Sequence, residues 1–240
     1  MMRPKSALYY TKDIETIAIE FTDKLKSLQD SENRVKVGRA CQEYALDSIS
    51  CIFLGEKIGA LSETTVANNL IENMGIFMKH GLPMFLLSPS RVEWYPFYRK
   101  TVKASTDVIV AASRLVEKAI DNIDIEDITD ESILAKLVRK HGKDSKVPLI
   151  MAIDAIGAGI DTTGNQASFL LYHLAKHPEV QEKLYDEIQA CIAKDGSLTA
   201  DSLMKMRYLK ACQQESQRLL PVTSGVSRET QVIFNANLNF

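Results

Sequence analysis

The chain has 240 residues, of which 45% are hydrophobic and 25% are charged, and its formal net charge is −2 at pH 7. This length and composition are typical of a globular protein with a substantial core. The charge balance argues against nucleic acid as a partner, because there is no surplus of Lys and Arg to neutralise phosphates.

Hydrophobic spacing predicts helices along most of the first half of the chain. Apolar residues at intervals of three and four predict amphipathic helices over residues 12–28, 38–54, 63–79 and 99–121. Between the last two helices, residues 81–97 contain three prolines in a dense apolar and aromatic sequence. We expect a long irregular connection there, and such connections usually carry function.

The second half begins with a short helix before the loop HGKDSK and continues with the longest helical run, at about 147–176. Pro178 opens a further helix at 178–193, since proline suits the first helical turn. One more helix is expected at about 201–219, and the sequence after Pro221 is strand-like. There is no β-α-β alternation, so the predicted fold class is mainly α.

The middle of the longest helix, AIGAGIDTTGNQASF, contains three glycines, Gly157, Gly159 and Gly164. Each glycine weakens a helix interior by about 1 kcal/mol relative to alanine. Helical spacing is expected to place small and acidic residues on one stripe, namely Asp154, Gly157 with Ala158, Asp161 and Asn165. Such a stripe lets a large flat group approach the backbone.

A purely structural interpretation of the same glycines is that they allow another helix to cross close to this one. This interpretation leaves Asp161 unexplained, because a buried carboxylate needs a partner or a role in proton transfer. Next to it, Thr162 can donate its hydroxyl to the Ala158 carbonyl and so compete with the helical hydrogen bonds. The spacing alone leaves the two interpretations open.

The first ten residues, MMRPKSALYY, lack both the apolar segment of a secretory signal and the Arg-rich pattern of a transit peptide. We therefore expect either a cytosolic protein or a sequence whose true N-terminus is missing. No run approaches about 18 uninterrupted apolar residues, so no membrane-spanning helix is expected. The histidines His173 and His177 lie four apart but have no evident third ligand, which favours surface positions.

The four cysteines, Cys41, Cys51, Cys191 and Cys212, form no C-x-x-C pair and have no metal-ligand spacing. We expect them to be buried reduced thiols.

Two motifs in a fixed order carry a resemblance to a known family. The run Ala158-Gly159-Ile160-Asp161-Thr162-Thr163 resembles the A-G-x-D/E-T-T signature in the long central helix of the cytochromes P-450, the haem-thiolate monooxygenases. Downstream, Glu215-Ser216-Gln217-Arg218 resembles the E-x-x-R of that family's K helix. The helix opening H-P-E-V-Q-E-K-L and the run L-K-A lie between the two motifs, and Pro221 and Arg228 follow the second motif. The order makes the resemblance specific, since E-x-x-R alone is common.

The N-terminal half resembles the mitochondrial-type members of the family. Tyr44-Ala45-Leu46-Asp47-Ser48-Ile49 is similar to their W-A-L-E-S-I segment, and Pro89 to Lys100 is similar to their F–G connection. The resemblance implies a partial cytochrome P-450 fold, from about the D helix to the K helix and the first strand after it. It also implies one partial haem-thiolate monooxygenase domain over residues 1–240, truncated at both ends.

The resemblance assigns roles to residues of the central helix. Ala158 and Gly159 match positions where dioxygen sits beside the haem, and Thr162 matches the alcohol that hydrogen-bonds the reacting oxygen. Asp161 matches the acid that relays protons to it. Arg228 matches an arginine that binds a haem propionate, although a surface arginine is the alternative.

The resemblance also implies a structural ion pair between Glu215 and Arg218 and a contact between Lys210 and a ferredoxin. Mitochondrial-type members carry a second lysine four residues later, where this chain has Gln214. The family's iron ligand is a cysteine in a glycine-rich loop near the C-terminus. None of the four cysteines has that context, so we expect the iron ligand to be absent from this chain.

The implied function is a haem-dependent monooxygenase that inserts one oxygen atom from dioxygen into a small lipophilic substrate, such as a steroid or a xenobiotic. Val222 to Val226 and parts of 83–97 would line its substrate pocket. The implied location is the mitochondrion, in association with the inner membrane, and residues 81–97 would touch a membrane surface or pack against the following helix. The fragment is expected to be inactive alone.

Two rival hypotheses stand beside this one. The chain is either a non-catalytic helical splice product or a degenerate copy without haem, or it is a helical scaffold unrelated to haem. The last of these requires the motif order to be a coincidence.

Overall fold

The structure is a computed structural model that describes residues 8–85, 91–192 and 198–223. All regular structure in these ranges is helical, so the mainly α prediction is confirmed. The helices are η1 Leu8–Tyr10, α2 Thr11–Ser27, α3 Val37–Leu54, α4 Thr65–Phe85, η2 Val92–Trp94, α5 Tyr98–Asn122, α6 Ile133–His141, α7 Lys146–Lys176, α8 Pro178–Cys191, α9 Ala200–Lys205 and α10 Arg207–Leu219.

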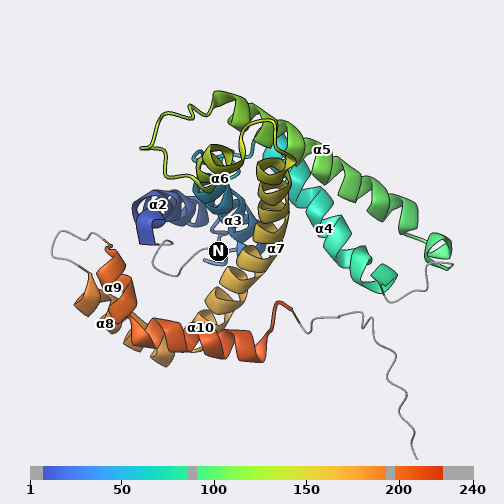
Figure 1. Cartoon of the computed structure of the whole chain (residues 1–240). Helices are drawn as coiled ribbons and strands as arrows, with labels where there is room; N and C mark the ends of the chain where they lie inside the picture. The colour runs from blue at the N-terminus through green and yellow to red at the C-terminus, as the bar shows by residue number, and fades with distance from the viewer. Residues whose placement is uncertain (1–7, 86–90, 193–197, 224–240) are drawn as a thin grey trace, which may run out of the picture.

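Helix α7 crosses the whole molecule, and the other helices are arranged around it (Figure 1). It contacts α3, α4, α5, α6, α8 and α10, and its contact with α3 is the most extensive in the fold. Ala152, Ile156 and Ile160 are fully buried on the side of α7 that faces the core. They belong to one hydrophobic cluster with residues of α3, α4, α5 and α6.

By length and composition α7 is also the one helix, within the described ranges, that could span a membrane. The sequence prediction had excluded such a helix because it required an uninterrupted apolar run. Aspartate, glycine and threonine interrupt the apolar run in α7, yet an 18-residue stretch of the helix keeps a mean hydropathy of 1.2. Because α7 packs against six other helices, we interpret it as the core helix of the fold.

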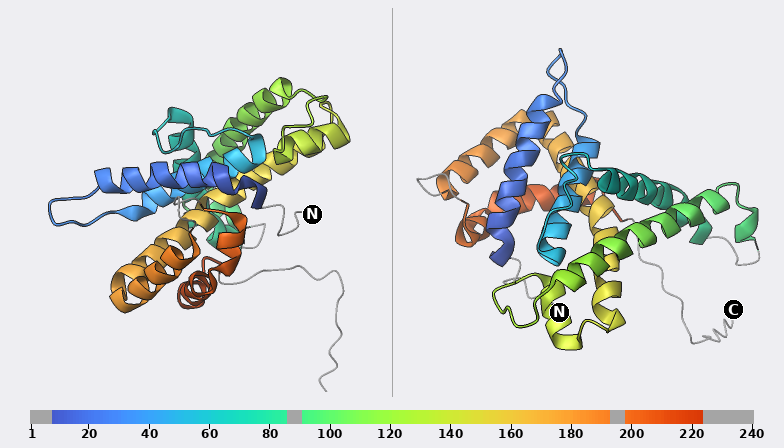
Figure 2. Two further views of the ribbon diagram at one scale, coloured as in Figure 1. Left: turned by 90° about the vertical axis from the view of Figure 1, so that its left-hand side faces the viewer. Right: turned by 90° about the horizontal axis from the view of Figure 1, so that it is seen from above.

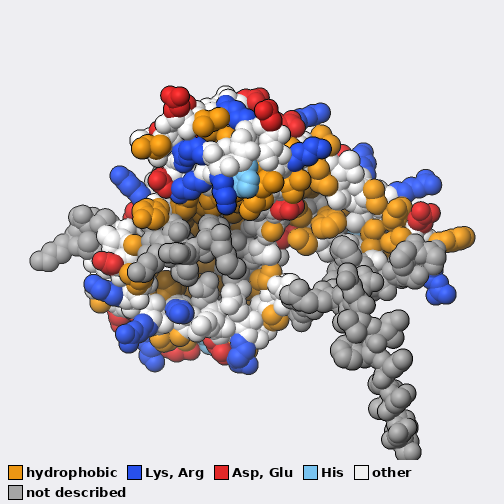
Figure 3. Space-filling model, viewed as in Figure 1, with side chains coloured by type: hydrophobic (Ala, Val, Ile, Leu, Met, Phe, Trp, Pro, Cys, Tyr) orange, Lys and Arg blue, Asp and Glu red, His pale blue; other side chains and the backbone are white. Residues whose placement is uncertain are grey.

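The other helices form two groups at the sides of α7. Helices α4 and α5 lie side by side as an arm that extends away from the core (Figures 1 and 2). Apolar side chains are exposed over this arm in the space-filling view (Figure 3). Helices α8, α9 and α10 gather at the C-terminal end of α7 (Figure 1).

The irregular connection predicted for 81–97 begins later than expected, because α4 continues through Pro83 to Phe85. Proline usually ends or kinks a helix. Here Met84 lines a small cavity together with Phe77 of α4 and with Thr101, Val102 and other residues of α5, so the extra turn lies beside α5.

The single helix predicted for 201–219 is two helices, separated at Met206, whose φ of −73° and ψ of 78° are not helical. The carboxylate of Glu187 on α8 accepts hydrogen bonds from the backbone N–H groups of Tyr208 (2.7 Å) and Leu209 (2.9 Å). These are two of the N–H groups that the first turn of a helix leaves without an internal partner. Glu187 therefore fixes the start of α10. The strand-like segment lies almost entirely outside the described residues.

Two of the three α7 glycines allow the close crossing with α3. A Cβ atom on Gly164 would lie 2.9 Å from the Cα of Gln42, and one on Gly159 would lie 2.9 Å from Cγ1 of Ile49. By contrast, a Cβ on Gly157 would meet only the end of the flexible Met74 side chain, at 3.2 Å. The crossing-helix interpretation is therefore correct for Gly159 and Gly164.

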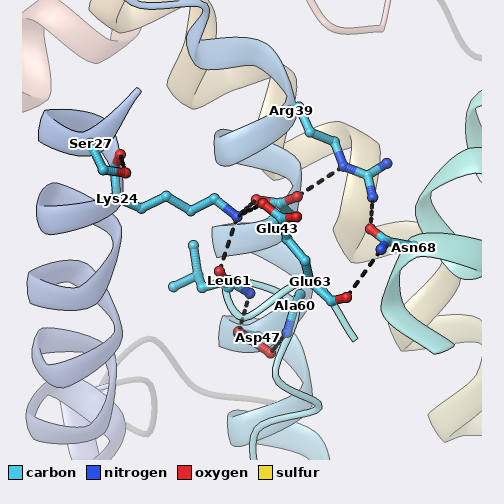
Figure 4. A network of polar contacts seen from close by, with 9 residues as sticks. All are labelled: Lys24, Ser27, Arg39, Glu43, Asp47, Ala60, Leu61, Glu63 and Asn68. Carbon is cyan, nitrogen blue, oxygen red and sulfur yellow. Dashed lines mark hydrogen bonds and ion pairs between the residues drawn. The ribbon is translucent and has the colours of Figure 1, made fainter. Parts of the chain in front are cut away.

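Polar contacts fix α3 to the loop before α4 and to α2 (Figure 4). Asp47 is 1% exposed, and its carboxylate accepts the backbone N–H groups of Gly59 (2.8 Å), Ala60 (2.9 Å) and Leu61 (3.0 Å). Lys24 of α2 lies 2.7 Å from the Glu43 carboxylate and donates to the Leu61 carbonyl at 2.9 Å. Asp47, in the segment that resembles W-A-L-E-S-I, thus holds the loop against α3.

Burial alone would lower the pKa of Lys24, but its contacts with Glu43 and Glu63 outweigh burial, so the pKa is raised and the ammonium stays charged.

We predict that Gly164→Ala lowers the free energy of unfolding by about 2 kcal/mol, because the new methyl group must push the α3 backbone away. Gly75→Ala is the matched control, since a Cβ on this glycine of α4 meets nothing within 4 Å. It should stabilise the protein by about 0.5–1 kcal/mol through helix propensity. Urea unfolding measures both, and equal effects of the two substitutions would contradict the close crossing.

We predict that Asp47→Ala lowers the free energy of unfolding by about 3 kcal/mol, because three buried or partly buried N–H groups lose a charged acceptor. Asp23→Ala is the control, since Asp23 is exposed on α2 and pairs only with Lys26 one turn away. Its effect should stay within about 0.5 kcal/mol. Urea unfolding again provides the measurement, and a small effect of Asp47→Ala would show that the loop is held by other contacts.

Candidate functional site

Asp161 lies at the crossing of α7 and α3 and is 5% exposed. Its Oδ1 accepts a hydrogen bond from Nε2 of Gln42 at 2.7 Å, and its Oδ2 is buried without a hydrogen-bond partner. Burial raises the pKa of the Asp161 carboxyl, and the hydrogen bond from Gln42 offsets part of that rise. The carboxyl is therefore easier to protonate than an exposed aspartate.

Thr162 lies on the opposite, exposed side of α7. Its hydroxyl donates to the Ala158 carbonyl at 2.7 Å, as the sequence predicted, and Ala158 is exposed one turn earlier. The hydroxyl is therefore held by a backbone carbonyl and keeps its oxygen lone pairs available as acceptors.

The single stripe predicted for Asp154, Ala158 and Asp161 is wrong for Asp161. Asp154 and Ala158 are exposed, whereas Asp161 is buried against α3. Asp154 and Asp161 are seven residues apart and therefore lie within about 20° of each other around α7, but about 10 Å apart along it. Helix α3 covers α7 at Asp161, whereas Asp154 faces the cavity beside α4 and α5.

Two cavities flank the open side of α7. The first, of about 270 Å³, lies between α7 and the α4–α5 arm, and its lining is mostly apolar: Met74, Phe77, Met78, Ser105, Val108, Ile109, Ile153, Asp154, Gly157 and Ala158. The second, of about 470 Å³, lies between α7, α10 and the residues after α10, and is lined by Thr162, Thr163, Gln166, Ala167, Leu170, Gln213, Gln217, Val222 and Thr223. Ala158 and Thr162, one turn apart, thus each line one of the two cavities.

A flat apolar cofactor such as haem needs a wall of small side chains that other helices leave open. The exposed strip from Ala158 to Thr162, with a cavity on each side, fits one face of such a group. Gly159 does not contribute to that strip, because it packs on Ile49 of α3. Arg228, the expected propionate contact, lies outside the described residues.

The four cysteines fit less well as iron ligands, since all of them lie within helices. Cys41 is fully buried on α3, and burial raises the pKa values of the Cys41, Cys51 and Cys212 thiols. A raised pKa disfavours the thiolate that binds iron. Within the described ranges, no group of three or more His, Cys, Asp or Glu side chains could hold a metal ion. The described residues thus fit a wall for the cofactor and not its iron ligand.

Glu215 and Arg218 pair on the exposed face of α10. Arg218 donates from Nε to Oε2 of Glu215 at 2.8 Å and from Nη2 to Oε1 at 2.7 Å. This bidentate hydrogen bonding with Arg218 holds the pKa of Glu215 below its usual range. Lys210, the expected ferredoxin contact, is exposed on the same helix, as is Gln214 one turn later.

A groove of about 430 Å³ separates α7, α8 and α10 and is lined by residues that include His173, His177, Cys212 and Glu215. The two histidines share no ligand: His173 Nδ1 lies 3.1 Å from the Ser216 hydroxyl, and His177 Nδ1 lies 3.4 Å from the Glu179 carboxylate. Sequence reasoning missed the contact between His173 and Ser216.

Sequence reasoning also missed Gln42, which contacts Asp161 from 119 residues away. No motif signals such a contact.

Comparisons with known proteins give one consistent result. The sequence model of the family described as cytochrome P-450 matches residues 1–232. The chain is 28% identical to the probable cytochrome P-450 12a5, mitochondrial, of Drosophila melanogaster, over 95% of this chain and 45% of the relative. It is 28% identical to cytochrome P-450 10 of Lymnaea stagnalis, over 95% of this chain and 43% of the relative.

Among solved structures, the crystal structure of the cytochrome P-450DA heme domain matches with a TM-score of 0.64 and 18% identity. The match covers 87% of this chain and 45% of that one. The likeness shows the fold. The chain spans about 45% of the length of the curated relatives that it matches.

We predict that Asp161→Asn makes stability less dependent on pH. Because the folded pKa of Asp161 is raised above 3.8, the wild-type protein loses stability as the pH rises from the unfolded to the folded pKa. Asparagine does not ionise, so the free energy of unfolding of the variant should rise relative to that of the wild-type protein across that interval. The rise should be about 1.4 kcal/mol for each tenfold difference in proton affinity between the folded and the unfolded state. Urea unfolding at a series of pH values measures this, and parallel curves would contradict a raised pKa.

Proposed function

The chain belongs to the cytochrome P-450 family, and we propose that the protein containing it is a haem-dependent monooxygenase of mitochondrial type. It would insert one oxygen atom from dioxygen into a small lipophilic substrate. The observation that carries this proposal is the position of Thr162, which is exposed on the open side of the central helix and lines one cavity, while Ala158 one turn earlier lines the other. Helices α3 to α7 share one hydrophobic cluster, and α2, α8 and α10 pack against them, which supports a single domain over residues 1–240.

Haem, when bound, would supply the redox chemistry that activates dioxygen. Ala158 and Thr162 would form the wall facing it, because both are small and exposed. Arg228, outside the described residues, is proposed to bind a propionate. We do not carry Gly159 forward as a cofactor contact, since it packs on α3.

The reaction that we propose consumes protons, and two neighbouring residues could manage them. The Thr162 hydroxyl, anchored by the Ala158 carbonyl, can accept a proton at its oxygen while it passes its own onward. Asp161 can hold a proton at Oδ2, which is buried and free of hydrogen bonds, and burial favours the protonated form. The carboxyl and the hydroxyl lie on different sides of α7, so a water molecule or a rotation of a side chain must connect them.

The substrate class is inferred from the cavity beside Ala158. Met74, Phe77, Val108 and Ile109 give it an apolar wall, which suits a lipophilic compound such as a steroid or a xenobiotic. Val222 and Thr223, from the segment that follows α10, line the other cavity.

The partners and the location follow from family membership. We propose a ferredoxin as electron donor, with Lys210 as one contact, and a mitochondrial location in keeping with relatives that are named mitochondrial. Trp94, 86% exposed in η2, which packs against α5, and Phe97, 43% exposed just before α5, support association of this part of the chain with a membrane surface.

The alternative is a non-catalytic helical splice product or degenerate copy without haem. It is favoured by the four cysteines, whose helical settings do not suit iron ligation. The coding sequence beyond Phe240 separates the two hypotheses. A glycine-rich loop with a cysteine there supports the enzyme, and an immediate stop codon supports the alternative.

In the complete protein, Thr162→Ala should uncouple oxygen use from product formation by about tenfold, with release of hydrogen peroxide, because the hydroxyl no longer delivers protons. Thr22→Ala is the matched control: its hydroxyl also donates to a carbonyl four residues earlier, at 2.8 Å, but on α2. Product formed per dioxygen consumed is the measurement. Unchanged coupling in Thr162→Ala would remove Thr162 from the mechanism.

A further inference from the structure

Gln42 of α3 is the one side chain that hydrogen-bonds the Asp161 carboxyl within the described ranges. Its Nε2 lies 2.7 Å from Oδ1, although 119 residues separate the two positions. Asp161 is 5% exposed, so water competes little for this contact. The other carboxyl oxygen, Oδ2, has no hydrogen-bond partner.

Gly164 makes the contact sterically possible. A Cβ atom at this position would lie 2.9 Å from the Cα of Gln42 and 3.0 Å from its Cγ. A larger residue at 164 would therefore push both the α3 backbone and the Gln42 side chain away from α7. The three residues act together. Gly164 leaves space between the helices, the Gln42 amide extends across this space, and the Asp161 carboxyl accepts its hydrogen bond.

We propose that Gln42 is the positioning residue for Asp161: its amide fixes Oδ1 and leaves Oδ2 as the oxygen that takes up and releases the proton. This proposal rests on the proposed function, because it assumes that Asp161 relays protons to the side of Thr162.

The chemistry of the partner matters for this role. A lysine or arginine at position 42 would hold Asp161 as a carboxylate, since an opposite charge favours the ionised form. The neutral amide donates a hydrogen bond without adding a charge. Burial raises the pKa of Asp161 and the hydrogen bond from Gln42 lowers it, and no charged side chain of the described chain contributes to the shift.

The neighbours of Gln42 on α3 make their polar contacts elsewhere. The Cys41 thiol hydrogen-bonds with Ser168. Glu43 pairs with Lys24 at 2.7 Å and with Arg39 at 3.0 Å. Among these three neighbours on α3, Gln42 is the one whose side chain hydrogen-bonds Asp161.

Infrared spectroscopy of the complete protein tests the proposal without relying on activity. The carbonyl stretch of protonated Asp161 is identified by its loss in Asp161→Asn, and its pH titration gives a midpoint. In Gln42→Met, which keeps the size of the side chain but not the donor, the proton affinity of Asp161 should rise about tenfold, or one pH unit. The stretch should also shift in frequency because Oδ1 loses its hydrogen bond.

Gln42→Glu is the second variant, in case Gln42→Met does not fold. It replaces the amide donor by a second carboxyl at the same position, so the two carboxyls share one proton, and this shared proton should be lost at a higher pH than in the wild-type protein. Gln166→Met is the matched control: Gln166 is a half-buried amide of α7 whose Nε2 has no partner, and its loss should leave the midpoint unchanged. An unchanged midpoint in a folded Gln42 variant would overturn the proposal.

Turnover measurements separate this proposal from the proposed function. If both are correct, Gln42→Met lowers product per dioxygen while the KM for substrate stays the same. A wild-type protein with no monooxygenase activity would refute the proposed function, while the infrared midpoint would still decide whether Gln42 positions Asp161. A shifted midpoint with unchanged coupling would overturn the link to catalysis.

Discussion

The close crossing of α3 and α7 is the constraint on which the rest of the structure depends. Because Gly159 and Gly164 have no side chains, α7 lies so close to α3 that a Cβ atom on Gly164 would be 2.9 Å from the Cα of Gln42. This approach buries one side of α7 and leaves the opposite side open. Asp161 and Thr162 are neighbours in the sequence, but the rotation of about 100° per residue places the acid on the buried side and the alcohol on the open side.

Most of the fold could be predicted from the sequence, because each helix has its own periodic pattern of apolar residues. The predictions failed where contacts with distant residues decide the outcome. Pro83 would normally end α4, yet the helix continues beside α5. The break at Met206 depends on a carboxylate of α8, and no local pattern around residue 206 indicates it.

The candidate site could be predicted only in part. The order of the two motifs identified Asp161 and Thr162, but spacing could not show which side of α7 another helix would cover. For this reason the predicted stripe grouped Asp161 with exposed residues, and Gly159 was assigned to the cofactor although it packs on Ile49. Gln42 could not be found, because only the folded chain brings it to Asp161.

The cap that Glu187 places on α10 has a consequence for how this family member tolerates changes in length. Glu187 of α8 hydrogen-bonds the first backbone amides of α10 directly. The rotation of α10 about its own axis is therefore fixed by α8 and not by the connection between the two helices. Residues added or lost between 192 and 200 need not turn Glu215 and Arg218 to another face. The orientation of the E-x-x-R motif is thus set by the contact between α8 and α10.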